Sequence, residues 1–539
     1  MRSERLSVET DQQAEQEFRI TAMESVEPRS FARLATAHPR FFLAVLTIIY
    51  GFGAILAANR RHFEFDEIMT YSLAELLDIR QIWTAIGKGI ELNPPLPFWL
   101  AWIIHHTIGG GEIASRIPAI FGFWLMCFCI YHFVWRRCGT VFGFVAFLLP
   151  LFTYPASDAA VARGYGLMLG LSALALLCWQ LAFDGVHRAL SLAGLAVGIA
   201  GAVSCHYYAV YVVGALSAGE LARTLTRRRV DAAVWAALAA GLSPLALYAP
   251  LLRSAAAGAL KNFWVSAQPQ FIYESYADLL GPTAMVFLLL LSILLRPGKR
   301  AELEGKNIRW ALPALQLHEC TACFVLVAMP FVLYLAGLFA KVPFYTRYVM
   351  PVTIGFSITM AAFAHRIGGG NPRLQRVLLS LLVWCCLLPW VLFQISKQIV
   401  ARPPAEYLES RPQLPADTSL PVVFDSETDF IEYFHYGSLA VRSRIFNLID
   451  REAAIKYRGT DTGLRSMAVA QTFRDIHAVD YHQFVTAHPA FYLMRLREEG
   501  WTLQKLLADG ASVQLLRLEK DKGTFVQSHT IFRVTMPGR

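Results

Sequence analysis

Charged residues are scarce in this chain of 539 residues. Asp, Glu, Lys and Arg together make up only 17% of it, whereas hydrophobic residues make up 55% and the mean hydropathy is +0.42. A water-soluble domain is about one quarter charged. The balance therefore argues against a soluble enzyme and favours a protein that spans a membrane.

Cysteine is absent from the C-terminal part of the chain. All nine Cys residues lie between Cys127 and Cys386, so no disulfide framework supports the segment after residue 396. Cys320 and Cys323 form a CxxC without a second pair, which favours two small buried residues over a metal or redox site. The segment after residue 396 also has no Gly-rich phosphate loop and no metal-ligand spacing.

The net charge of +9 is not spread along the chain. Residues 397–539 hold 18 Lys and Arg against 17 Asp and Glu, and residues 1–40 hold 6 against 7. The surplus therefore lies between residues 41 and 396, in short connectors between apolar runs. This is the positive-inside pattern of membrane proteins rather than a nucleic-acid-binding stripe, so nucleic acid is not expected as a partner.

Apolar runs of spanning length dominate residues 41–396. About 20 apolar residues are needed to cross the hydrocarbon core, and eleven runs of about that length occur: 41–58, 117–135, 139–155, 164–183, 189–205, 206–221, 232–252, 279–295, 322–340, 349–365 and 377–396. The shorter run 94–108 contains three prolines, and we predict a re-entrant or interfacial helix there. The polar residues 1–40, which resemble no cleavable signal peptide, are predicted to form a disordered cytoplasmic tail.

The basic connectors orient these runs. Arg and His residues gather at 136–137, 187–188, 227–229, 296–309 and 366–376, which are therefore expected in the cytoplasm. A topology of eleven spans puts all of these basic connectors in the cytoplasm only if 94–108 does not cross the membrane. The long loop 59–116 and the C-terminal segment then lie outside. The alternation of helical and strand-like stretches in 397–539 predicts a small soluble α/β domain there, outside the cytoplasm.

Four polar motifs fall at the outer ends of the predicted spans. Asp66 and Glu67 follow the first span in RRHFEFDEIMTYS, where a carboxylate suits a general base and also suits a helix cap. Asp158, Arg163 and Tyr165 lie in YPASDAAVARGYGL, where the arginine suits a phosphate and also suits an interfacial anchor.

The other two motifs combine rings with cations. His206 and Tyr207 form a turn between two spans, where a histidine is more often a polar anchor than an acid or base. Lys341, Arg347 and Tyr348 lie in KVPFYTRYVMP, which suits a lipid phosphate or an ordinary interfacial belt. An acid, several cations and aromatic rings on one face together indicate an enzyme that uses a phosphate-bearing lipid donor.

The order of the motifs resembles that of a known family. FxFDE after the first span, PPL at 94–96, SRIPAIFG at 115–122, ARGYGLMLGLSAL at 162–174, the HYY turn and YTRYVMP at 345–351 appear in turn. This series is similar to the membrane glycosyltransferases of the GT-C fold over residues 41–396. Bacterial relatives of the dolichyl-phosphate-mannose protein mannosyltransferases are the nearest branch. Lipopolysaccharide and aminoarabinose transferases are close to it.

The resemblance implies a reaction and roles for matching residues. Asp66 corresponds to the essential acid of the first outer loop and Glu67 to its companion, while Arg163 and Arg347 correspond to arginines that contact the lipid phosphate. The donor site would be completed by Tyr165, Tyr348 and Lys341. The sugar or the acceptor would be contacted by Asp158, His206, Tyr207 and Asn93. Asn93 stands where the family often has a histidine.

The implied function is transfer of a sugar, with inversion, from a polyprenyl-phosphate donor to an envelope glycolipid, glycan or protein. The enzyme would lie in a bacterial inner membrane, surrounded by membrane lipids. No cofactor is implied, and a divalent metal is neither required nor excluded. A flippase of lipid-linked sugars is one alternative, although no internal repeat supports it. A membrane-anchored binding or assembly protein is the other.

Overall fold

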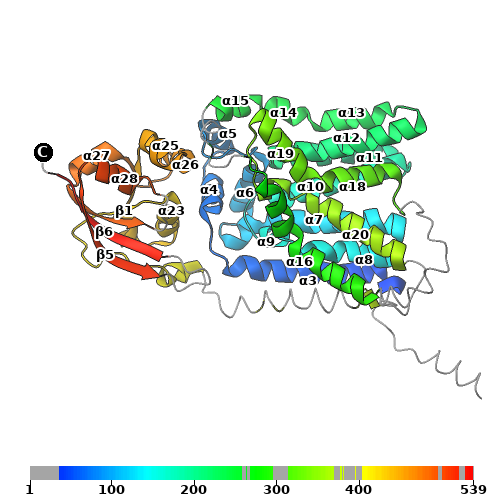
Figure 1. Cartoon of the computed structure of the whole chain (residues 1–539), viewed down its shortest axis with the longest axis horizontal. Helices are drawn as coiled ribbons and strands as arrows, with labels where there is room; N and C mark the ends of the chain where they lie inside the picture. Colours follow the sequence, from blue (N-terminus) through cyan, green and yellow to red (C-terminus); the bar gives the residue numbers. More distant parts are fainter. Residues whose placement is uncertain are drawn as a thin grey trace, which may run out of the picture.

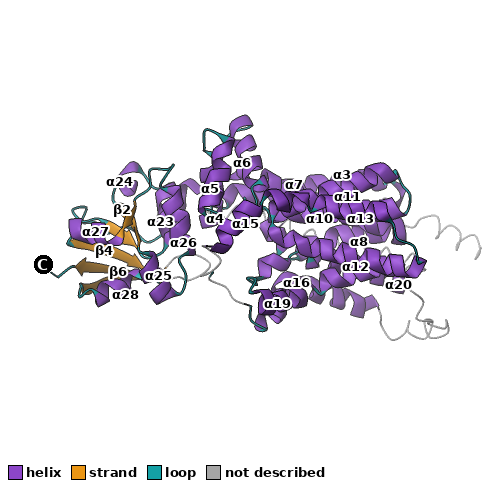
Figure 2. Cartoon of the chain, turned by 90° about the horizontal axis from the view of Figure 1, so that it is seen from above, coloured by secondary structure: helices purple, strands orange, loops and turns teal. Residues whose placement is uncertain are grey.

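The computed structural model describes residues 35–257, 263, 267–294, 314–368, 404–495, 500–520 and 528–537, and the single positions 377, 378, 380, 392 and 395. Most of the predicted cytoplasmic tail, 1–40, lies outside these residues. The described chain has a bundle of long helices and, beyond one end of the bundle, a domain built on a β-sheet (Figure 1). Three short helices, α4 to α6, lie between the two parts (Figures 1 and 2).

The bundle is a membrane domain. Four of its described helices are long and apolar enough to span a bilayer: α3 (Pro39–Arg60), α7 (Glu112–Cys138), α10 (Tyr165–Phe183) and α11 (Arg188–Cys205). Two helix pairs raise the number to six if each bent pair counts as one span. They are Ala232–Leu247 with Ala249–Ala257, bent by 55°, and Leu317–Val327 with Met329–Ala340, bent by 57°. The chain is therefore a multi-pass membrane protein, as its composition predicts.

The expected number of spans, about eleven, is larger than this count. Three of the remaining predicted runs fall on shorter or more polar helices, namely α8 (Thr140–Leu148) with η1 (Leu149–Phe152), α12 (Val210–Arg227) and α20 (Val352–Gly368). Another falls on the 25-residue helix α16 (Gln270–Leu294). The run 377–396 lies outside the described residues except for the single positions given above. Four spans, or six with the bent pairs, are established within the described residues, and eleven stays a prediction.

Glycines set the closest packing in the bundle, between α7 and α10. A Cβ on Gly122 of α7 would collide with the backbone of Leu167, and one on Gly170 of α10 would collide with the carbonyl of Gly122. Gly166 faces the backbone of Ala119 in the same way. Small residues four apart let two membrane helices approach backbone to backbone. The motifs SRIPAIFG and ARGYGLMLG are therefore packing motifs as well as neighbours of the site.

The loop 59–116 folds into α4 (Phe65–Ala74), α5 (Ile79–Lys88) and α6 (Leu96–Thr107). A capping box between Glu64 and Glu67 starts α4, and the Asp78 side chain accepts from the Arg80 N–H to start α5. Gly89, with φ at 95°, ends α5 in the left-handed conformation. At about 1.5 Å per residue, the 12 residues of α6 reach about 18 Å, less than the hydrocarbon thickness. Its length fits the predicted re-entrant or interfacial helix.

The C-terminal domain is α/β, as the sequence predicts. Its six strands lie in the order β3-β2-β1-β4-β6-β5. The first four in this order are parallel, while β6 runs antiparallel to both β4 and β5. The strands are β1 (Val422–Phe424), β2 (Ile445–Ile449), β3 (Ala478–Asp480), β4 (Ala490–Arg495), β5 (Ser512–Lys520) and β6 (Ser528–Thr535). The helices are η6 (Pro404–Ser410), α23 (Glu427–Tyr436), α24 (Leu439–Arg442), α25 (Arg451–Arg458), α26 (Thr462–Ala470), α27 (Tyr481–Ala487) and α28 (Thr502–Ala508).

The two parts of the chain share a hydrophobic core. Buried residues of the loop 59–116, including Phe63, Ile68 and Ile86, belong to the same cluster as Phe430 and Met467 of the C-terminal domain. Helices α23 and α26 therefore pack directly on α4 and α5 (Figure 1). This joint matters for the site, because α4 carries Asp66.

Candidate functional site

Asp66 lies in the first turn of α4, a helix at the end of the bundle that meets the C-terminal domain (Figure 1). Its side chain remains 44% exposed. One of its carboxylate oxygens, Oδ2, is 3.7 Å from Nη2 of Arg163, and the backbone carbonyl of Asp66 accepts a hydrogen bond from Nη1 of Arg163 at 3.4 Å. The structure thus brings together two residues that lie almost 100 positions apart in the sequence. It leaves the Asp66 carboxylate open to an incoming group.

Arg163 is held mainly by a second acid, Glu91. The Arg163 side chain is only 7% exposed, and both of its terminal nitrogens donate to the Glu91 carboxylate, Nη2 at 3.3 Å. Burial raises the pKa of Glu91 against the opposing effects of Arg163 and a hydrogen bond from Asn93. The pKa of Arg163 is raised overall, because Asp66 and Glu91 outweigh the lowering by burial. Arg163 therefore links two carboxylates, and Asn93 supports the pair from the Glu91 side.

Glu67 faces inward, away from Asp66. It forms a bidentate ion pair with Arg116 at 2.8 and 2.9 Å, with both side chains fully buried. Its carboxylate also accepts from the backbone N–H of Ala162 at 2.6 Å and from that of Glu64 at 3.2 Å. Both oxygens of Glu67 are thus engaged in tying α4 to α7 and to the segment that carries Arg163.

A second arginine–acid pair lies nearby. Nε of Arg347, in the short 3-10 helix η4 (Thr346–Val349), is 3.8 Å from Oδ2 of Asp158 and 3.4 Å from the hydroxyl of Tyr154. Asp158 is 5% exposed, and its Oδ2 accepts no hydrogen bond. Burial raises the pKa of Asp158 to about 6, with Arg347 and Arg61 opposing the rise. Arg347 itself is 29% exposed, so its guanidinium is more accessible than that of Arg163.

Arg61 joins the two pairs. It donates to Glu64 at 2.6 Å and to the carbonyl of Ser157 at 3.3 Å, so the start of α4 is held beside Asp158. The pKa of Glu64 is lowered, since Arg61 and Arg347 outweigh the rise caused by burial. Glu64 and Asp158 therefore lie close to the guanidinium groups of Arg61 and Arg347 on one polar face.

Aromatic rings close the inner side of this face. The rings of Tyr165, Tyr208 and Tyr348 all lie within 5.5 Å of the His206 ring, and Tyr208 stacks on Tyr348 at 4.4 Å. His206 is 4% exposed, and its Nδ1 accepts from the Tyr208 N–H at 3.2 Å. Burial, aided by Arg163, lowers the pKa of His206 to about 3. The imidazole is therefore neutral at physiological pH, and its place is among the rings.

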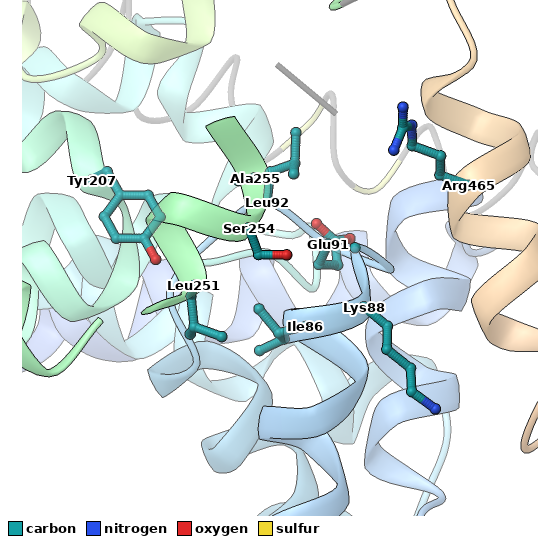
Figure 3. Close-up of a pocket in the computed structure, with 10 residues that line it drawn as sticks. Ile86, Lys88, Glu91, Leu92, Tyr207, Leu251, Ser254, Ala255 and Arg465 are labelled. Carbon is teal, nitrogen blue, oxygen red and sulfur yellow. The ribbon is translucent and has the colours of Figure 1, made fainter. Parts of the chain in front are cut away.

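The remaining predicted residues lie at the edge of the site. Lys341 is exposed at the end of α19 (Met329–Ala340), in the left-handed conformation with φ at 52°. Tyr207 faces Tyr248, with ring centroids 6.5 Å apart, and lines a pocket of about 60 Å³. The pocket lies between α5, α15 (Ala249–Ala257) and α26, and its lining includes Glu91, Ser254 and Arg465 (Figure 3). Tyr207 thus belongs to this pocket rather than to the ring cluster around His206.

Two partner residues were missed by the sequence analysis. Glu91 carried a signal, because it stands three positions before the paired prolines in a stretch poor in acids. Arg116 also carried one, because an arginine inside an apolar helix requires a partner in the membrane domain. In the described part of the chain, no group of three or more His, Cys, Asp or Glu residues is arranged to hold a metal ion.

The fold matches two crystal structures of ArnT from Cupriavidus metallidurans. The structure bound to undecaprenyl phosphate has a TM-score of 0.54 at 12% sequence identity, covering 92% of this chain and 98% of that chain. The apo state has the same TM-score and identity, covering 93% and 98%. The Archaeoglobus fulgidus oligosaccharyltransferase complex with Zn and sulfate is more distant, with a TM-score of 0.44 at 10% identity over 83% of this chain and 68% of that one.

The likeness to ArnT confirms the GT-C fold that the motif order predicts. It also extends beyond the motifs, since coverage of 92% includes much of the C-terminal domain. No protein-family model and no curated protein sequence matches the chain.

Proposed function

We propose that this protein is a membrane glycosyltransferase. It moves a sugar from a polyprenyl-phosphate donor to an envelope glycolipid, glycan or protein on the outer face of the membrane. The observation that carries the proposal is the partly exposed Asp66 carboxylate 3.7 Å from the guanidinium of Arg163, with a second, partly exposed guanidinium, that of Arg347, held at Asp158. The fold supports it, because a structure of the same fold holds undecaprenyl phosphate.

Asp66 is the general base in this proposal. The acceptor hydroxyl or amine loses its proton to the Asp66 carboxylate while its oxygen or nitrogen bonds to the anomeric carbon of the sugar. The bond from that carbon to the phosphate oxygen breaks at the same time, which inverts the configuration. Phosphate departs with the bonding electron pair, so catalysis rests on positioning and on stabilising the developing charge.

Arg347 is the main phosphate ligand, and Arg163 orients the base. Arg163 is buried and engaged by Glu91 and Asp66, whereas Arg347 is partly exposed and makes only longer contacts among the described residues, 3.4 Å to the Tyr154 hydroxyl and 3.8 Å to Asp158. A guanidinium that is not yet saturated can turn its donor fork to phosphoryl oxygens. Tyr348 and Tyr165 line the donor side of the site, and exposed Lys341 supplies charge at its rim.

Glu67 has a positioning role rather than a direct one. Its buried pair with Arg116 leaves no oxygen free for substrate. Asp158 and Asn93 act through Arg347 and through the Glu91–Arg163 pair, and His206 supports the ring cluster. We also propose eleven spans, a cytoplasmic N-terminus and an outer C-terminal domain. A reporter fused after Arg539 that is active only in the cytoplasm would contradict this topology.

The test uses a strain that lacks the gene. Mass spectrometry of its envelope glycolipids, glycans and proteins should show the loss of one sugar, restored by the wild-type protein. Asp66→Asn should fail to restore it, while Asp78→Asn, which changes an exposed acid of the same loop, should succeed. Full restoration by Asp66→Asn at wild-type protein levels would rule out the base mechanism.

The same strain separates the alternatives. If the protein were a flippase, the strain that lacks it would keep the donor lipid on the inner face of the membrane. Sugar transfer by a strain carrying Asp66→Asn would then be intact once donor is supplied to the outer face. A binding or assembly protein would purify without undecaprenyl phosphate and would not bind it when it is added.

A further inference from the structure

The C-terminal domain contacts the catalytic loop at two points next to its acids. On α23, the Tyr436 hydroxyl accepts a hydrogen bond from the backbone N–H of Phe63 at 2.7 Å, three residues before Asp66. On α26, the Ser466 hydroxyl donates to the carbonyl of Ile90 at 2.9 Å, one residue before Glu91. The two contacts thus flank the two carboxylates that hold Arg163.

The contact at Phe63 is part of a longer brace. The Tyr436 hydroxyl also donates to Glu112 at 3.2 Å, in the first turn of α7. From the opposite side, Arg116 donates to the carbonyls of Arg61 and His62 at 2.6 and 3.0 Å. Residues 61–63 are therefore fixed between a side chain of the C-terminal domain and a buried guanidinium of the membrane domain.

Other contacts also hold the C-terminal domain against α4 and the segment before it. Nη1 of Arg474 donates to the hydroxyl of Ser72 on α4 at 2.5 Å, and the His62 ring lies 4.2 Å from that of Tyr407. Phe63 is 1% exposed within the hydrophobic core that the two parts share. Shifting the C-terminal domain would therefore move α4 with it.

We propose that the C-terminal domain is a working part of the active site, and that Tyr436 and Ser466 are positioning residues. Tyr436 fixes the segment that ends in Asp66, and Ser466 fixes the segment that ends in Glu91. Together they set the distance between the two acids across Arg163. This inference rests on the proposed role of Asp66, and it assigns to the domain a function in turnover beyond that of a support.

The first test is structural and needs no substrate. Tyr436→Phe in the full-length purified protein removes one hydroxyl and keeps the ring. Tyr433→Phe is the matched control, because its hydroxyl donates to the Pro412 carbonyl at 2.8 Å on the same helix but within the C-terminal domain. Hydrogen exchange of the peptide covering residues 61–67 should quicken about tenfold in Tyr436→Phe and stay unchanged in Tyr433→Phe.

The second test measures the consequence for turnover. Sugar restored to the envelope by Tyr436→Phe should fall about tenfold or more, because small displacements of a base are costly. The Kd for undecaprenyl phosphate should stay within about twofold, because the phosphate ligands are untouched. Ser466→Ala should act in the same direction, and Tyr436→Phe should cause no further loss in an Asp66→Asn background.

The outcomes separate this inference from the proposed function. If Tyr436→Phe and Tyr433→Phe exchange and transfer alike while Asp66→Asn is inactive, the domain is a passive support and the inference is wrong. If Asp66→Asn transfers normally, Asp66 is not the base and the proposed mechanism fails, and the exchange experiment still reports whether Tyr436 holds the loop.

Discussion

Arg116 and Glu67 form an ion pair with no exposed side-chain surface on either partner, Nε to Oε1 at 2.8 Å. The pair is satisfied on all sides, since Arg116 also donates to three backbone carbonyls, those of Ala58, Arg61 and His62. These hydrogen bonds explain why Arg116 can be buried near the N-terminus of the membrane helix α7. The pair also makes Glu67 a residue on which the geometry of its neighbour Asp66 depends.

Removing one partner of this pair should be strongly destabilising. Glu67→Gln leaves a buried guanidinium without its counter-charge, and the expected loss is about 3–5 kcal/mol. Glu64→Gln is the comparison, because the Arg61–Glu64 pair is 29% and 43% exposed and should contribute less than about 1 kcal/mol. Thermal unfolding of the detergent-purified variants measures both. Equal shifts in Tm for the two variants would show that the buried Arg116–Glu67 pair contributes no more to stability than the exposed Arg61–Glu64 pair.

The two arginines of the site should differ in phosphate binding. Arg347→Gln removes charge-assisted hydrogen bonds of about 1.5–3 kcal/mol, so the Kd for undecaprenyl phosphate should rise about 10- to 100-fold. Lys341→Gln, at an exposed position, should change it by less than about threefold. Titration of the purified protein with the lipid gives both values. A large effect of Arg163→Gln with none of Arg347→Gln would reverse the assignment of the two arginines.

Asp158 should make stability fall as pH rises. Its pKa is about 6 in the folded state, compared with about 3.9 for an ordinary aspartic acid. Below about pH 4 the carboxyl is protonated in both states. Between about pH 4 and 6 only the folded state keeps the proton, so raising the pH lowers the free energy of unfolding. The full penalty, about 3 kcal/mol, is present above pH 6.

The Asp158→Asn variant tests this slope. It should show a smaller decrease in Tm between pH 4.5 and 7 than the wild-type protein, and it should be the more stable of the two at pH 7. Asp78→Asn, at an exposed position, serves as the control for general effects of pH. A wild-type slope that Asp158→Asn leaves unchanged would mean that Asp158 is ionised throughout this range.

Local sequence patterns predicted the helices and strands of this fold well where the pattern lay within one segment. The apolar run at 41–58 became α3, Glu67, one of the two acids that suited a helix cap, takes part in the capping box of α4, and the alternation after residue 420 became a sheet. The run 94–108 became the 12-residue helix α6, and its re-entrant or interfacial placement stays a prediction. In each case the cause lies within about 20 residues.

The partners of the charged residues could not be predicted from local sequence in the same way. Asp66 and Glu67 are adjacent in the sequence and were given similar roles, yet the turn of α4 exposes one and buries the other. Arg163 suggested a phosphate ligand, but its main partner is Glu91, which lies 72 positions away. Which charges neutralise one another depends on how α4, α7 and the segment before α10 meet, and no single segment carries that information.

The contact between α7 and α10 offers a test of the bundle itself. A Cβ on Gly170 would collide with the carbonyl of Gly122, a backbone group that cannot move aside without separating the helices. Gly170→Ala should therefore destabilise the protein by about 1–3 kcal/mol. At Gly51 of α3, no atom of the described residues outside that helix's own backbone lies within 4 Å of an added Cβ. Gly51→Ala should instead be neutral or stabilising by up to about 1 kcal/mol, because alanine favours a helix.

Thermal unfolding in detergent compares the two variants directly, and the site provides a second readout. Arg163 lies at the start of α10, so a shift of this helix against α7 should also displace Arg163 from Asp66 and lower sugar transfer. Gly51→Ala should leave transfer unchanged. If Gly170→Ala is as stable and active as Gly51→Ala, the close approach of the two helices is not needed, and the glycines of ARGYGLMLG must serve another purpose.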